Sequence, residues 1–569
     1  MENQAKKINI RLILPIVHIA LSFFYERLVL KFHDEAAVAF SVPLNDTFST
    51  TFEKILCYVM AKIMAAVIIF ALWKLFFVII DKKTDREVKW VFLGIFAVLA
   101  IALIIRWPEV FTRGGDNYIP YSYAVRLMPE FWHSIWLSSL YTASFMVFPH
   151  AVAINLLQLI SFVFAWGYLY DRIKQSPLFE KCNWVRFLTF FFLLFRDFWL
   201  VATNPERAEY NVAFTLLFVT VVTMDMAEKK KRSAAGLAGL TVFAAFLAVF
   251  RSEGIVIGTL GFVLLVLFVY RDGIKRILGS FALFAVAFFV FSLPAKVGEI
   301  KYYGNDYSIM NTFPNMANFL NYPGTDLSYE GADKDLEAIA GIAPLEALKE
   351  YGTNGYRRYN YAEGRIDFNQ SCADDETGNA YMSAYRRIAL HNPMLYAKTQ
   401  WTGFLQAIAA RPAYVEPYRG PGCGLEPYGW EMWDVGLQDI NDIPGRYRWE
   451  NIGLRSRIAD LLRSVEQLNI DLQNRLYLYT IFIALEIILS ILLILKTLVS
   501  VIKKDYSCLC RGLMLCVLDA YLFLMVVMIP TGYHMYFHAY IFVMFAAELL
   551  FIPSLLKKGG KEKTAGREI

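Results

Sequence analysis

Charged residues are scarce in this chain. Only 19% of its 569 residues are Asp, Glu, Lys or Arg, whereas soluble proteins contain about 25%. Hydrophobic residues make up 57% of the chain, which is more apolar surface than a soluble protein could cover. The composition therefore excludes an ordinary soluble domain and predicts an all-α polytopic membrane protein.

Several motifs that would indicate other functions are also missing. The sequence has no Rossmann fingerprint, P-loop, HExxH or paired CxxC, which argues against nucleotide-driven transport and against structural zinc. The N-terminus has basic residues before an apolar stretch but no small-x-small cleavage site, so we expect an uncleaved first span. We find no internal repeat of about 20–50 residues.

Long apolar runs recur along the chain and predict about twelve transmembrane helices, because one span needs about 20 apolar residues. The shortest runs lie at the lower limit of this length. The predicted spans are 9–31, 55–80, 90–106, 150–170, 184–203, 210–226, 234–250, 254–270, 275–294, 477–498, 512–530 and 538–556.

Clusters of Lys and Arg assign the two ends of these spans, because cytoplasmic loops are enriched in positive charge. One alternating path places the N-terminus and the clusters at 81–89, 171–175, 228–232, 271–276, 503–504 and 557–563 on the cytoplasmic side. Both termini of this multi-pass cell-membrane protein are then cytoplasmic. The chain divides into two additional N-terminal spans (1–89), a core with a first outer loop at 107–149 (90–294), an extracytoplasmic domain (295–476), and C-terminal spans with a cytoplasmic tail (477–569).

Two outer regions carry predicted helices besides the spans. We interpret 120–148 as one or two helices along the outer membrane surface; an extra hairpin of two short spans would leave the charge pattern unchanged. The extracytoplasmic domain is rich in Gly, Pro, Asn, Asp and Tyr, and we expect it to be mostly helical or irregular. Helices are predicted at 333–351 and 378–410, and Pro393 should kink or split the second.

Cysteine is used sparingly, with seven residues scattered along the chain. Cys372 and Cys423 fall on the outer side of this topology, where they either form a disulfide or remain free thiols. The two cysteines of "CLC" (508–510) lie at the inner face and supply only half of a zinc site. We therefore interpret that pair as part of the helix packing.

Polar residues gather at the outer ends of the spans, although the basic clusters assign the topology without them. Charges at the bilayer edge are costly unless they are paired or line a wet cavity. Together they supply a carboxylate that can act as a general base and cations that can hold a phosphate. The candidates are Asp116 and His133 after the third span, Glu206, Arg207 and Glu209 before the sixth, Arg251 and Glu253 between the seventh and eighth, and Tyr533, His534 and His538 before the last.

Each candidate also has a purely structural interpretation. Asp116 either acts in catalysis or caps a helix or turn behind two glycines, and Arg251 and Glu253 either contact a ligand or pair with each other. The two glutamates of "NPERAEYN" are alternatively solvated charges, and the histidines are alternatively ordinary interfacial residues. His534 and His538 lie one helical turn apart, so they could hold a metal or a phosphate.

Ionisable residues also occur inside predicted spans, where they are rare. We interpret these as partners of other helices or as helix-end residues. They include Arg196, Asp197, Glu486, Asp519 and Glu548.

This pattern resembles the GT-C class of integral membrane glycosyltransferases, which includes protein mannosyltransferases and bacterial aminoarabinose transferases. In that class an Asp follows the first span of the catalytic core, and Asp116 is similarly placed after the third span. The Arg-x-x-Gly turn of the class is matched by Arg251–Gly254. His133 aligns with the His of a His-Pro stretch, although Ser134 replaces the proline. The late loop "YHMYFH" offers His where the class often has Arg.

The resemblance implies an inverting transfer of a sugar from a polyprenyl-phosphate donor to an acceptor hydroxyl at the outer membrane face. The acceptor would be a glycan, a lipid or an envelope polymer. Asp116 would act as the general base, while cationic side chains would stabilise charge on the leaving phosphate. Some members of the class use a divalent metal and others do not; Asp116, His534 and His538 are the candidates to hold one. We expect membrane lipids, but no nucleic acid, as further partners.

Three other functions fit parts of the pattern. A transporter or flippase for a lipid-linked saccharide suits twelve spans, but transporters usually carry internal repeats and charges near the midplane. A polysaccharide polymerase or ligase would use the same face and a similar donor to transfer a whole oligosaccharide. A non-catalytic assembly factor would leave the outer carboxylate without a role.

Overall fold

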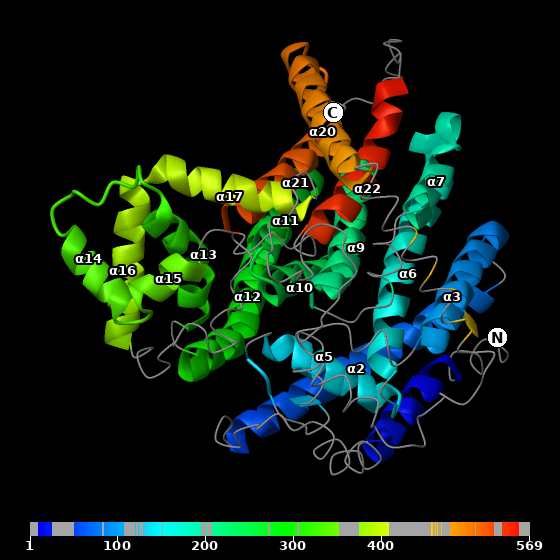
Figure 1. The fold of residues 1–569 in the computed structure, drawn as a ribbon. Coiled ribbons are helices and arrows are strands. Elements are labelled where there is room, and N and C mark those ends of the chain that lie inside the picture. The colour runs from blue at the N-terminus through cyan, green and yellow to red at the C-terminus, as the bar shows by residue number, and fades with distance from the viewer. Residues whose placement is uncertain are drawn as a thin grey trace.

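The chain is built from helices in the computed structural model (Figure 1). The structure describes residues 10–25, 51–106, 134–194, 207–351, 375–408, 478–528 and 537–556, apart from gaps at 82–84, 151, 271–272, 304–305 and 507, with a few isolated residues between these ranges. No strand occurs among them, so the predicted all-α class is confirmed for the described part of the chain.

The helices follow one another in a simple chain order. They are Ile10–Tyr25, α2 (Thr51–Ile80), α3 (Arg86–Arg106), α5 (Ile135–Val147), α6 (Ala153–Gln175), η2 (Pro177–Cys182), α7 (Val185–Leu188), η3 (Thr189–Leu194), α9 (Arg207–Glu228), α10 (Ala234–Phe250), α11 (Gly254–Val269), α12 (Ile274–Tyr303), α13 (Asp306–Asn321), α14 (Ala332–Ala340), α15 (Leu345–Tyr351), α16 (Asp375–His391), α17 (Pro393–Ala407), α20 (Leu478–Ile502), α21 (Leu509–Met528) and α22 (His538–Leu556).

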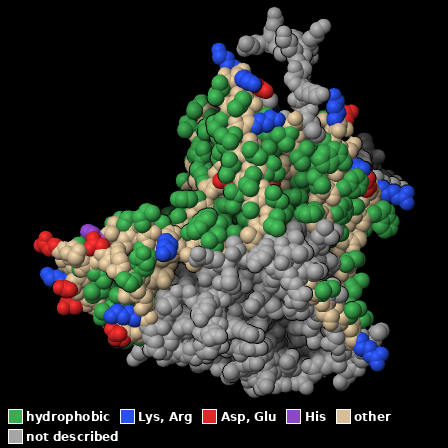
Figure 2. Space-filling view, turned by 45° about the horizontal axis from the view of Figure 1, so that its top comes forward, with side chains coloured by type: hydrophobic (Ala, Val, Ile, Leu, Met, Phe, Trp, Pro, Cys, Tyr) green, Lys and Arg blue, Asp and Glu red, His purple; other side chains and the backbone are tan. Residues whose placement is uncertain are grey.

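Seven of the described helices are long and apolar enough to cross a membrane: α2, α3, α6, α9, α12, α20 and α21. Shorter apolar helices lie at Ile10–Tyr25 and at α5, α10, α11 and α22. Hydrophobic side chains cover much of the bundle surface in Figure 2, with charged side chains mostly near its ends. The chain is therefore a helical, multi-pass membrane protein.

A helix lies at every predicted span except 184–203, where the described residues form α7 and the 3-10 helix η3. Side chains use the carbonyl groups of this turn: Trp166 Nε1 donates to the Thr189 oxygen (3.3 Å), and Thr189 Oγ1 donates to the Arg186 oxygen (2.6 Å). Such contacts compete with the regular helix ladder. In contrast, α12 continues through Pro294 to Tyr303 instead of ending near the proline as predicted.

The centre of the bundle is α9, which packs against α6, α10, α11, α21 and α22. Of its most apolar stretch 83% is buried, compared with 11% for α2, α3 and α12. The exposed apolar faces of these three helices suit contact with lipid. The interior of the bundle is thus made by the helices whose ends carry the candidate site residues.

Tight packing joins α10 and α11 into a hairpin. A Cβ on Gly254 would lie 2.2 Å from the backbone oxygen of Leu247, and one on Gly258 would lie 2.6 Å from that of Ala244. Small residues at this spacing let two helices approach closely inside a membrane. The hairpin holds the short turn Arg251–Glu253 at the end of the bundle.

A separate group of helices, α13 to α16, has its own hydrophobic core around Phe313, Ile339 and Tyr381. Figure 1 shows α17 leading from this group toward α21. Tyr396 of α17 donates a hydrogen bond to the backbone oxygen of Val527 (2.8 Å), and Thr480 of α20 donates one to that of Ile408 (2.6 Å). These contacts fix α17 against the ends of α20 and α21.

Breaks inside this group agree in part with the sequence. The predicted split at Pro393 is confirmed, because α16 ends at His391 and α17 begins at Pro393. The predicted helix 333–351 is instead two helices, α14 and α15, interrupted around Gly341 and Pro344. The sequence did not indicate α13 at all.

The segment 120–148 forms a helix, α5, but not one with a free outer face. Twelve of its residues, Ile135 to Met146, are buried, and α5 lies along α2 and also packs against α6 and α12. With 13 residues it is too short to span a membrane. The expectation of a surface helix is corrected to a helix enclosed by its neighbours, because its small and apolar residues pack on every side.

Candidate functional site

A buried ion pair occupies the turn between α10 and α11. Arg251 pairs with Glu253, and each side chain is 6% exposed. Ser252 Oγ donates a hydrogen bond to the second oxygen of Glu253 (3.0 Å), and the Gly254 amide donates to the Arg251 oxygen (2.9 Å). The pair predicted as one alternative for these residues therefore exists, and it is held by a closed turn.

A second buried pair joins the starts of α9 and α22. His538 Nδ1 lies 3.2 Å from Glu209 Oε1, and neither side chain is exposed. A carboxylate oxygen only accepts, so the histidine donates this hydrogen bond. The interpretation of Glu209 as a solvated surface charge is wrong, because the side chain is enclosed.

The helices that carry these two pairs are in direct contact. α9 packs against α11, α21 and α22, and the side-chain oxygen of Asn211 lies 3.9 Å from the place a Cβ on Gly254 would take. The chain thus brings the α10–α11 turn against the first turns of α9, two residues beyond Glu209.

Tyr521 of α21 extends the site from a third direction. It is completely buried, and it lies within electrostatic range of both Glu253 and Arg251. Its hydroxyl has no hydrogen-bond partner among the described residues. A buried hydroxyl without a partner is destabilising by about 1–3 kcal/mol, so such a group calls for an explanation.

Other predicted site residues cannot be placed in the same way. Arg207 is the first residue of α9 and is half-buried. Asp116, His133, Glu206, Tyr533 and His534 lie outside the described residues, as do Cys372 and Cys423. The arrangement that the structure describes is therefore one side of the predicted constellation, made by Glu209, Arg251, Glu253 and His538.

This arrangement suits the binding of an anion more directly than the binding of a metal. A guanidinium has five N–H donors, and a carboxylate can engage only some of them, so Arg251 can also contact a phosphate oxygen. Among the described residues no group of three or more His, Cys, Asp or Glu side chains could hold a metal ion. Glu209 and His538 would supply two ligands.

Sequence analysis missed the role of polar residues in the middle of the C-terminal helices. Asp519 of α21 accepts hydrogen bonds from Ser490 of α20 (2.8 Å) and from Tyr540 of α22 (3.2 Å), which confirms that it joins helices. Glu486 and Glu548 are buried nearby and interact electrostatically with each other. Within the described part of the chain, neither oxygen of Glu486 has a hydrogen-bond partner.

No family model matches the sequence, and neither a curated protein nor a solved structure matches it. The functional argument therefore depends on the residues and their geometry.

Proposed function

We propose that the chain is an inverting glycosyltransferase of the GT-C type, which transfers a sugar from a polyprenyl-phosphate donor to an acceptor hydroxyl. One observation supports this most: charged residues far apart in the sequence are buried together where α9, α11, α21 and α22 meet. Ionisable residues inside a membrane domain are costly, and by default they indicate a functional site.

In this proposal the buried pairs position the groups that handle the donor. Glu253 holds the Arg251 side chain in the turn, so that its remaining N–H donors face the donor phosphate. The His538–Glu209 pair joins α22 to α9 and orients the histidine. Tyr521 supplies a hydroxyl that donates a hydrogen bond when a phosphate oxygen is present.

The chemical step needs one base and one leaving group. Asp116 accepts the proton of the acceptor hydroxyl while the hydroxyl oxygen attacks the anomeric carbon of the sugar. The bond between that carbon and the phosphate oxygen breaks, and polyprenyl phosphate leaves with the electron pair. Attack from the opposite face inverts the configuration, and cationic side chains stabilise the charge that develops on the phosphate.

The proposal includes the finer membrane topology. Twelve spans place both termini in the cytoplasm, residues 295–476 outside the cell membrane, and the catalytic face on the outer side. Single cysteines introduced at Lys230 and Asp375 test this, because a membrane-impermeant thiol reagent should label only the second in intact cells. Labelling of both positions would contradict the topology.

The carboxyl groups midway along the C-terminal helices favour a second candidate, a proton-coupled transporter or flippase of lipid-linked saccharides. Glu486, Asp519 and Glu548 come from three helices, and buried carboxylates of this kind mark proton pathways in transporters. In this candidate the outer pairs bind the saccharide lipid but catalyse no reaction.

One assay separates the two candidates. The purified protein in detergent receives a radiolabelled polyprenyl-phosphate sugar together with a membrane extract as acceptor. A transferase moves label into the acceptor fraction without a membrane, whereas a transporter moves none and shows activity only in sealed vesicles. In the second case Glu486→Gln should abolish transport driven by a pH gradient.

A further inference from the structure

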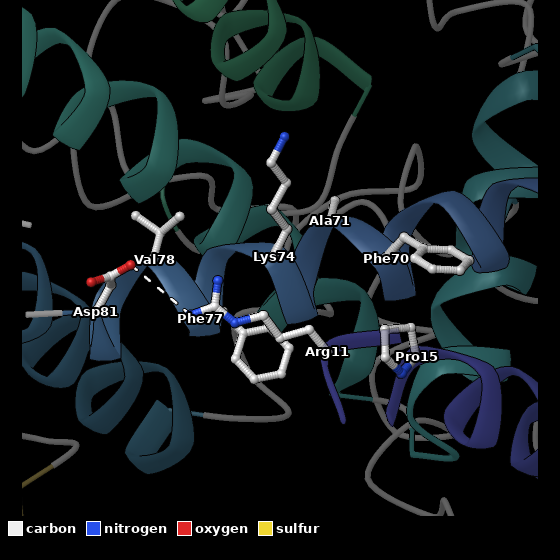
Figure 3. A pocket seen from close by; sticks show the side chains of 8 residues that line it. All are labelled: Arg11, Pro15, Phe70, Ala71, Lys74, Phe77, Val78 and Asp81. Carbon is white, nitrogen blue, oxygen red and sulfur yellow. Dashed lines mark ion pairs between the residues drawn. The ribbon is translucent and has the colours of Figure 1, made fainter. Parts of the chain in front are cut away.

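A cavity of about 420 Å³ lies away from the charged pairs, between the Ile10–Tyr25 helix and the last turns of α2 (Figure 3). Its walls are mostly apolar, while charged side chains surround its opening. The lining residues are Arg11, Pro15, Phe70, Ala71, Lys74, Phe77, Val78 and Asp81. The proposed transferase mechanism uses none of them.

Polar contacts hold the two helices that form this cavity. Trp73 Nε1 of α2 donates a hydrogen bond to His18 Nδ1 (3.2 Å), and His18 Nε2 donates one to the backbone oxygen of Val147 in α5 (3.0 Å). A neutral histidine with its proton on Nε2 satisfies both contacts. The cavity is therefore set between two fixed helices.

The charged residues at the opening have a net charge of +1. Arg11 lies 4.0 Å from Asp81 and 5.4 Å from the ring centre of Phe77, and both members of the ion pair are partly exposed. Such a long, solvated pair contributes little. Lys74 extends away from this pair in Figure 3, and no ion pair of Lys74 occurs among the described residues. Two cations thus flank the opening, and only one has a carboxylate partner.

The surroundings of the cavity are apolar. Phe70 and Val78 of α2 are largely exposed, as are Ile13 and Ile16 of the facing helix, so this surface lies against the hydrocarbon of a membrane. The predicted topology places the Arg11 end of the helix pair at the cytoplasmic side. That leaflet carries the anionic lipids, and basic pockets between transmembrane helices bind their headgroups.

We propose that this cavity binds an anionic phospholipid of the cytoplasmic leaflet. The phosphate lies at Arg11, the flexible Lys74 side chain turns toward the headgroup, and one acyl chain runs along Phe70, Ala71 and Phe77. Asp81 opposes the bound anion, so its charge sets an upper limit to the affinity.

Native mass spectrometry of the full-length protein in detergent tests this site. The protein is titrated with dioleoyl phosphatidylglycerol, with dioleoyl phosphatidylcholine, or with inorganic phosphate. We expect phosphatidylglycerol to bind more tightly than phosphatidylcholine, and inorganic phosphate to leave its binding unchanged, because the acyl chain contributes to affinity.

Substitutions then assign the binding to the cavity. Arg11→Gln and Lys74→Gln should each weaken phosphatidylglycerol binding about fivefold, the effect of one cation near a membrane surface. Asp81→Asn should strengthen it, and Ala71→Phe should weaken binding of both lipids because the new ring fills the cavity. Lys503→Gln, at the end of α20, removes a cation from the same membrane face and should have no effect.

Two results would overturn the proposal. Equal phosphatidylglycerol binding by wild type, Arg11→Gln and Lys74→Gln would exclude the cavity as the site. Full competition by inorganic phosphate would show a simple anion site without an acyl-chain groove. Each variant is compared only if it elutes as wild type and unfolds at the same temperature; Asp81→Asn tests the site by a gain of affinity, which a folding defect does not produce.

Discussion

His538 donates a hydrogen bond to Glu209 over 3.2 Å in the bundle interior, although 329 residues separate them along the chain. Both side chains are fully buried. Their contact joins the first turn of α9 to the first turn of α22, next to the Arg251–Glu253 turn. Loss of one partner would leave a buried polar group that water cannot reach.

A double-mutant cycle should show this coupling. Glu209→Gln and His538→Gln should each lower the free energy of unfolding, by up to about 3–5 kcal/mol. The double variant should lose about 1–3 kcal/mol less than the sum. Denaturant unfolding in detergent measures both. Lys301→Gln, which breaks the more exposed pair with Glu53, should cost at most about 1 kcal/mol; additive losses at 209 and 538 would show that the pair is not coupled.

Glycine at position 258 should be required for the α10–α11 hairpin. A Cβ there would lie 2.6 Å from the Ala244 oxygen and 2.9 Å from the Ala248 nitrogen, so Gly258→Ala should destabilise the protein by about 1–3 kcal/mol. Gly239→Ala on α10 is the matched control, because nothing lies within 4 Å of its Cβ position. Thermal unfolding of both variants measures the difference, and equal stability would contradict the close packing.

Removal of the Tyr521 hydroxyl should separate stability from activity. The hydroxyl has no hydrogen-bond partner among the described residues, so Tyr521→Phe should leave the unfolding temperature unchanged or raise it. If the hydroxyl and Arg251 bind the donor phosphate, the KM for donor should rise about tenfold in Tyr521→Phe and in Arg251→Ala. Arg251→Lys should recover only part of the loss, since an ammonium lacks the guanidinium fork. An unchanged KM in both Tyr521→Phe and Arg251→Ala would remove them from the donor site.

Acid should loosen the α13–α16 group through one ion pair. Hydrogen bonds from Arg387 hold the pKa of the Asp335 carboxyl below its ordinary value of 3.8, with a further contribution from Tyr329. A lowered pKa means that the stabilisation is present above pH 3.8 and is lost as the pH falls through the folded-state pKa. Arg387 is half-exposed, so the pair contributes about 1 kcal/mol at most.

Hydrogen exchange of peptides from α14 and α16, corrected for intrinsic rates, measures this effect in the full chain. Protection should fall between pH 5 and pH 2 in wild type, a range set by ordinary Asp titration of about 3.9. Asp335→Asn should show lower protection at neutral pH and a smaller change with acid. The same acid response in wild type and Asp335→Asn would contradict the assignment.

Local sequence patterns predicted most of the helices but few of their contacts. Apolar runs locate the spans, and Pro393 separates α16 from α17 because it lacks the N–H that a helix interior needs. The break around Gly341 and Pro344 was overlooked, and α12 passes Pro294 because a proline in a long helix removes only one hydrogen bond. α13 carries Asn, Thr and Pro among its apolar residues, so its pattern is weak.

The candidate site divides in the same way. Arg251 and Glu253 are near neighbours in the sequence, so a short turn already predicted their ion pair. The Glu209–His538 contact depends on how α9 and α22 pack, and no local pattern encodes that. Tyr521 lies within an apolar run, where its hydroxyl is indistinguishable from that of an ordinary interfacial tyrosine.

The central claim is that the chain transfers a sugar at the outer membrane face with Asp116 as general base, and the turnover of Asp116→Asn tests it most directly. Purified wild type and Asp116→Asn receive radiolabelled polyprenyl-phosphate sugar and acceptor extract, with and without added divalent metal. We predict transfer by wild type and a turnover at least about a hundredfold lower in the variant, the usual contribution of a general base, with unchanged folding and donor binding. Near-wild-type turnover in Asp116→Asn, or no transfer by wild type under any of these conditions, would contradict the account.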